Sequence, residues 1–180
     1  MSRRSAGLQA CLNAALIFAA ASVVSAQSPP ASATATISGK MLSVQYSAPS
    51  VRGRKIFGAG GVLSRDPTYP VWRAGANSAT AFHTDADLDV GGLHVPKGTY
   101  TLYVSVQDPE AWQLIINKQT GQWGLSYNAA QDLGRVKMTM AKPPALVEKL
   151  NYSLTDQGAG RGELRLAWEN HIGRVPIAVK

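Results

Sequence analysis

The chain has 180 residues, a formal net charge of +7 and one cysteine. This length suffices for one domain with a sizeable hydrophobic core. Basic residues concentrate between positions 40 and 73 and acidic residues between 83 and 110, a dipolar distribution that argues against nucleic-acid binding.

The first 26 residues have the pattern of a signal peptide. Arg3 and Arg4 form a basic start, the apolar run 12–24 is too short to span a bilayer, and small residues precede Ala26. We therefore expect cleavage after Ala26 and a periplasmic or secreted product. Cys11 leaves with the signal, so the exported chain has no disulfide and thiol chemistry is excluded. No later apolar run is long enough to cross a membrane.

Residues 27–36 have the composition of a flexible leader. They are rich in Pro, Ser, Ala and Thr, which is typical of disorder. We expect residues 37–180 to form one folded domain after this leader.

From position 42 onward, apolar and polar residues alternate with a period of two. Such alternation is typical of half-buried antiparallel strands, and turn signals rich in Gly, Pro and Asp separate the segments. The pattern predicts an all-β domain, an antiparallel β-sandwich or jelly roll of about eight to eleven strands. The alternating segments are 42–47, 100–106, 112–116, 135–140, 149–154, 163–169 and 175–179.

Two long irregular segments, 48–79 and 118–134, interrupt the predicted strands. Loops of this length in a compact domain are usually functional or disordered. Both contain aromatic and charged residues, which favours ordered loops, and we expect them to close together over one end of the sandwich.

Several motifs in order along the chain resemble a bacterial family known as domain of unknown function 2911. The resemblance covers nearly all of the chain after the signal, implies an exported β-rich domain and supplies no activity. The motifs are Tyr46-Ser47-Ala48-Pro49, residues 53–58 (GRKIFG), residues 72–77 (WRAGAN) with Thr80, residues 93–102, Trp112, Asn117, residues 122–124 (QWG) and residues 166–169 (LAWE).

The predicted ligand site combines guanidinium, amide and aromatic groups near the two long loops. Arginine presents a planar fork of donors suited to carboxylate, phosphate or sulfate, and asparagine adds a donor and an acceptor. The alternative is that the arginines tie the loops down through backbone carbonyls or through Asp66. The candidate residues are Arg54, Arg73, Asn77, Trp72, Trp123 and Tyr46.

The alternating series His83, Asp85, Asp87 and Asp89 is the most metal-like pattern in the chain. On an extended strand these side chains share one face, and oxygen ligands suit calcium or manganese. A flat row does not surround an ion, however, so a solvated strand face is the preferred interpretation. We expect no bound metal and no cofactor.

The residues favour a non-catalytic envelope module that binds a small molecule, a glycan or a polypeptide. The alternative is an exported hydrolase acting on glycan or ester bonds. For that alternative the available groups are loop acids, a histidine and two serines, without a Gly-x-Ser-x-Gly motif. These groups are Asp66, Asp132, Glu169, His171, Ser47 and Ser126.

Overall fold

The computed structural model describes residues 27–180, so the predicted signal peptide lies outside the described residues. The first of two antiparallel sheets contains β1 (Pro30–Ile37), β2 (Lys40–Ser47), β4 (Thr80–Thr84), β7 (Gly98–Ser105), β8 (Gln113–Asn117) and β9 (Asp132–Lys137) in this spatial order, with β3 (Val71–Trp72) paired to β7. The second contains β11 (Val147–Gly158), β12 (Arg161–Glu169), β13 (His171–Val179), β5 (Leu88–Val90) and β6 (Leu93–Val95), with β10 (Thr139–Ala141) paired to β13.

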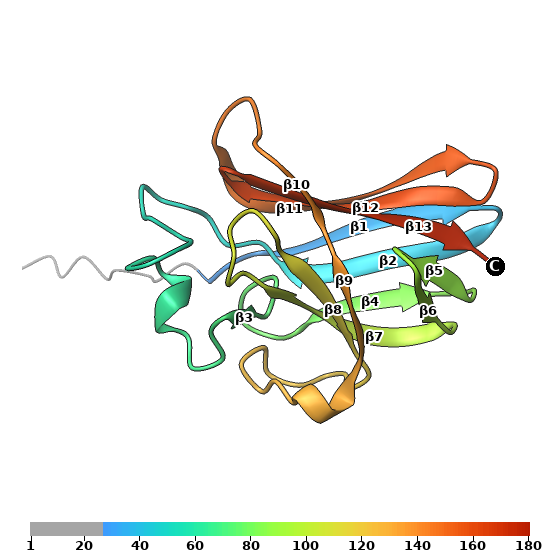
Figure 1. Ribbon diagram of the computed structural model, residues 1–180, viewed down its shortest axis with the longest axis horizontal. Coiled ribbons are helices and arrows are strands. Elements are labelled where there is room, and N and C mark those ends of the chain that lie inside the picture. The colour runs from blue at the N-terminus through green and yellow to red at the C-terminus, as the bar shows by residue number, and fades with distance from the viewer. Residues whose placement is uncertain (1–26) are drawn as a thin grey trace, which may run out of the picture.

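The two sheets face each other as the layers of a sandwich (Figure 1). The chain passes from the first sheet to the second in the bend after β4, and again at Met138, between β9 and β10. Two short 3-10 helices, η1 (Leu63–Arg65) and η2 (Ala129–Gln131), lie in the long loops. The predicted all-β antiparallel sandwich is confirmed. Within residues 27–180, no helix is long and apolar enough to cross a membrane.

The prediction of a disordered leader at 27–36 is wrong from residue 30 onward. Strand β1 pairs with β2 along its whole length, and the hairpin turns at Ser38 and Gly39, whose φ angles of 48° and 73° are both positive. Two left-handed residues give the turn that best fits the twist of a hairpin. Small alanines at alternate positions of β1 pack against the core, while the serine and threonines between them are exposed. The strand thus has the same period-two burial pattern as the other strands. The composition of the segment is nevertheless typical of disorder, and for this reason the prediction failed.

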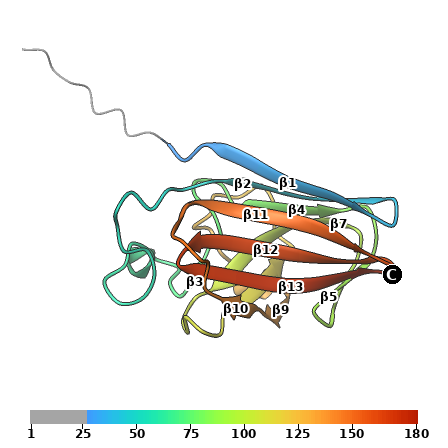
Figure 2. The same ribbon diagram turned by 90° about the horizontal axis from the view of Figure 1, so that it is seen from above.

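The core between the sheets is built from the inward-facing residues of both sheets. At one end it becomes aromatic, and this end lies opposite the C-terminus, where the segment 48–70 projects in both views (Figures 1 and 2). Phe57 from this segment packs edge-on against Trp72 and Trp168, with ring centroids 5.7 Å apart in each case. The aromatic residues of this end are Phe57, Trp72, Trp112, Trp168 and His171.

The second long loop contacts the first along residues 77–79, but most of it lies away from the end that the segment 48–70 covers, which corrects the expectation that both loops close over one end. Residues 118–131 cover the outer face of the first sheet, where Tyr103 and Ile115 are fully buried beneath Tyr127. Aromatic and branched residues on an outward face require such a cover, because exposed they form an apolar patch. The covering loop therefore has a packing role.

Candidate functional site

Trp72 belongs to the core, although its sequence neighbours made it a ligand candidate in a loop. It lies in β3 with 2% of its surface exposed, and its indole Nε1 donates to the carbonyl of Gly75 at 3.2 Å. Its ring stacks on Trp168 with centroids 5.4 Å apart. The side chain is therefore not accessible to a ligand.

The two arginines are held by groups of the protein itself. Arg54 donates from Nε to the carbonyl of Val51 at 3.0 Å and from Nη2 to the carbonyl of Ser50 at 2.7 Å. The guanidinium of Arg73 lies 3.8 Å from the carboxylate of Asp66. These contacts correspond to the alternative in which the arginines tie down the long loop.

Asn77 and Trp123 lie on neighbouring backbone segments, as expected if the two long loops meet. The backbone N–H of Gly124 donates to the carbonyl of Asn77 at 3.0 Å, and Ser78 forms an antiparallel bridge with Trp123. A Cβ at Gly124 would approach the Arg73 side chain to 2.5 Å, so only glycine fits this crossing. Trp123 is 53% exposed, so its ring lies largely in solvent.

Tyr46, the remaining candidate, forms a contact between the two sheets. Its ring meets Tyr152 of β11 with centroids 4.8 Å apart, and its hydroxyl accepts the backbone N–H of Tyr152 at 3.2 Å. Tyr152 in turn donates its hydroxyl to the carbonyl of Ala74 at 2.9 Å, and burial raises its pKa well above the ordinary value. Ligand binding by the six residues stays a prediction, and the structure gives the side chains of five of them, all but Trp123, polar contacts within the fold.

The acidic series of the metal hypothesis does not form a row, because β4 ends at Thr84. His83 contacts Thr99 and Asp85 at 2.9 and 3.0 Å, and Asp87 accepts the backbone N–H of Lys97 at 2.8 Å. Asp89 lies on β5 in the other sheet. Within residues 27–180, no group of three or more potential metal ligands converges.

A different constellation occupies the aromatic end, in the hairpin between β12 and β13. Trp168 pairs with His171, so Glu169 and Asn170 form a two-residue turn. Glu169 has a φ of 54°, a left-handed conformation that strongly favours glycine at the first turn position. Strained backbone conformations occur mostly at functional sites, so this glutamate is a candidate functional residue.

The carboxylate of Glu169 connects the hairpin to the long loop and to His171. Its Oε1 accepts the backbone N–H of Ile56 at 2.9 Å, and its Oε2 lies 3.3 Å from Nδ1 of His171. The second contact is a close approach and not a hydrogen bond, because Nδ1 has no hydrogen-bond partner within residues 27–180. The side chains of Glu169 and His171 are only 11% and 21% exposed, so solvent screens the pair weakly.

His171 is neutral near pH 7. Burial lowers its pKa below the ordinary value of 6.5, Lys142 lowers it further, and Glu169 opposes both. Because Nδ1 faces a carboxylate, we assign the proton to Nδ1, which leaves the lone pair on Nε2. The ring stacks on Trp112 with centroids 5.1 Å apart and is fixed in orientation.

A groove adjoins this histidine. It has a volume of about 490 Å³ and lies between the 106–112 connection, the end of β10 and the start of β13. These three segments lie at the end of the sandwich from which the segment 48–70 projects (Figure 1). Apolar side chains form much of its wall, with one ammonium, one carboxylate and one imidazole among them. The lining residues are Pro109, Glu110, Met140, Ala141, Lys142 and His171.

A family model described as "Protein of unknown function (DUF2911)" matches residues 28–177. The chain belongs to the DUF2911 family. The match begins just before β1, ends in β13 and includes every residue that lines the groove. Searches among curated proteins and among solved structures gave no match.

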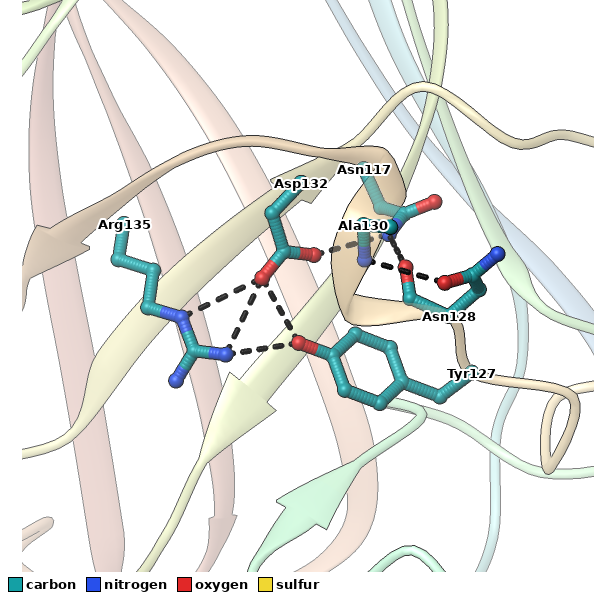
Figure 3. Close-up of polar contacts among 6 residues, drawn as sticks. All are labelled: Asn117, Tyr127, Asn128, Ala130, Asp132 and Arg135. Carbon is teal, nitrogen blue, oxygen red and sulfur yellow. Dashed lines mark hydrogen bonds and ion pairs between the residues drawn. The ribbon is translucent and has the colours of Figure 1, made fainter.

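A second polar cluster in this DUF2911 domain is structural (Figure 3). Asp132 accepts hydrogen bonds from Tyr127, Asn117 and Arg135, at 2.7 Å from the tyrosine hydroxyl and 2.8 Å from the amide. Burial and the contact with Asp132 raise the pKa of Tyr127 to about 12. The cluster anchors the 118–131 loop, and the many bonds to Asp132 leave it unsuited as a catalytic acid.

The sequence pointed to part of the groove. Sequence reasoning suggests Glu169 and His171 only for the hydrolase alternative, and no local pattern points to Lys142, Met140 or Glu110. The Trp-Glu-Asn-His stretch holds the detectable signal, because it places a glutamate at a hairpin position that usually takes glycine.

Proposed function

We propose that this DUF2911 protein is an exported envelope module that binds a small carboxylic acid with an apolar tail in the groove beside His171. The single observation that supports this most is the placement of Lys142 and His171, with Glu110, beside the apolar side chains of Pro109, Met140 and Ala141 in one groove. Few precisely placed polar groups on an apolar wall are typical of small-molecule sites.

Each lining group contributes to the choice of ligand. The ammonium of Lys142 attracts a carboxylate, and Nε2 of His171 accepts a hydrogen bond from a donor on the ligand. Glu110 lines the same groove and repels additional negative charge. This combination favours a monoanion over a phosphate or a dicarboxylate, and the apolar wall favours an aliphatic or aromatic tail.

The proposed location follows from the first 26 residues. Their basic start, apolar run and small residues before Ala26 support export and cleavage after Ala26. Release into the periplasm or outside the cell gives the groove access to small molecules of the envelope.

Hexanoate is expected to raise the thermal melting temperature of the protein in a saturable manner, and Lys142→Ala is expected to abolish most of this increase. A ligand that binds only the folded state stabilises it by about 2.7 kcal/mol at a concentration one hundred times Kd. The measurement is differential scanning fluorimetry over a hexanoate series.

Two controls make this test specific. Lys118→Ala removes an exposed lysine that does not line the groove and should keep the full hexanoate response. Hexylamine has a tail of the same length and the opposite charge and should not stabilise the protein. An equal response of the two lysine variants, or no response of the unmodified protein, contradicts the proposal.

A further inference from the structure

Glu169 and His171 combine backbone strain, a buried carboxylate and an oriented imidazole at the wall of a groove. Glu169 has the left-handed φ of 54° in a tight turn, and Ile56 fixes one of its oxygens at 2.9 Å. The other oxygen faces Nδ1 of His171 at 3.3 Å, while the ring lines the groove. A carboxylate this close to Nδ1 favours the tautomer that carries its proton there, which leaves Nε2 able to accept a proton.

We propose that the groove hydrolyses carboxylic esters, with His171 as the general base, Glu169 as the residue that positions it and Lys142 as the group that stabilises the oxyanion. This inference rests on the proposed function, because the acid released from the ester is the ligand class assigned to the groove. It adds a reaction and a substrate class to that function.

Water is the nucleophile in the proposed step. None of the six lining residues, all within residues 27–180, carries a hydroxyl or a thiol. Nε2 of His171 takes a proton from water as the water oxygen bonds to the acyl carbon, and the carbonyl oxygen becomes an oxyanion beside Lys142. The bond to the leaving alcohol oxygen then breaks, and that oxygen receives the proton from Nε2. Ester and water give acid and alcohol, with no change of oxidation state.

The test is hydrolysis of 4-nitrophenyl hexanoate, followed by nitrophenolate release. Substituting glutamine for His171 should lower kcat/KM about 100-fold, which is typical for the loss of a general base. His94 is exposed on β6 and does not line the groove, so His94→Gln should leave kcat/KM unchanged. This control excludes hydrolysis by surface imidazole.

Glu169→Gln tests positioning without removing the base. Glutamine keeps an oxygen for the N–H of Ile56 but presents an amide donor to Nδ1, which favours the other tautomer. We expect a loss of about tenfold or more in kcat with unchanged melting temperature. If His171→Gln does not fold, as judged by near-ultraviolet circular dichroism, Glu169→Gln decides the question.

The pH profile gives a further readout. Glu169, Lys142 and Glu110 are the charged groups around His171, and burial lowers the pKa of its imidazole. The rate should therefore rise with pH through a midpoint below 6.5 as the imidazole loses its proton. A profile without this rise contradicts the role of His171 as base.

The outcomes separate this inference from the proposed function. Saturable turnover that is lost in His171→Gln and kept in His94→Gln supports the esterase. Equal rates in the unmodified protein and in His171→Gln overturn it. If hexanoate stabilises the protein through Lys142 but the ester is not hydrolysed, the esterase is overturned and the binding function stands. If neither occurs, both are overturned.

Discussion

Trp72→Ala is expected to lower the free energy of unfolding by about 3–5 kcal/mol, the usual cost of removing a buried tryptophan. The indole is fully enclosed between Phe57, Trp112 and Trp168, so its loss leaves a cavity in the aromatic end of the core. Phe57 also loses one of its contacts, and the 48–70 segment should open more readily. Equilibrium unfolding in urea measures the change.

The matched control is Trp123→Ala, which should change stability by no more than about 0.5 kcal/mol because its ring is 53% exposed. The two tryptophans were equivalent ligand candidates in the sequence, and the structure separates them. Similar losses in the two variants would show that Trp72 is not the core residue that the structure describes.

Glu169→Ala is expected to destabilise the protein by about 1–3 kcal/mol, because the buried N–H of Ile56 loses its acceptor. Alanine at this position must also adopt the left-handed backbone conformation, which costs free energy for a residue with a Cβ. Glu169→Gly removes the same carboxylate but tolerates the φ of 54°, so it should be more stable than the alanine variant by about 1 kcal/mol. Chemical denaturation of the two variants, measured side by side, gives the difference.

An alanine variant at least as stable as the glycine variant would contradict the strained turn. An alanine variant as stable as the unmodified protein would contradict the link between Glu169 and Ile56. Since both substitutions remove the same charge, the comparison between them isolates the backbone contribution.

The fold was largely predictable, because period-two alternation is a local property of the sequence. Alternation in segments such as 100–106 and 163–169 identifies the residues that face the core between the sheets. It does not show that Thr101 and Tyr103, on the outer face of β7, are also buried. Strand β1 followed the same rule, but its alternating residues are alanine, serine and threonine, whose small contrast in polarity was overridden by composition. Alternation therefore carries information even where no large apolar residue is present.

The site was less predictable, because it depends on contacts between segments far apart in the sequence. Arg54 and Arg73 have the chemistry of anion-binding residues, but whether a guanidinium meets a ligand or its own loop is decided by the path of the backbone. The distance of 113 residues between Ile56 and Glu169 shows the same limitation. Lys142 becomes a candidate binding residue only because the end of β10 lies beside His171 in the fold. No local sequence pattern shows this proximity.

The most direct test of the proposed groove is a titration of the 15N-labelled protein with hexanoate, followed by amide chemical shifts in two-dimensional NMR. We predict that the largest shifts cluster on Glu110, residues 140–142 and His171, and that they saturate with a single dissociation constant. Shifts centred on residues 73–77 and Trp123, or shifts that do not saturate, would contradict the assignment of the ligand to this groove.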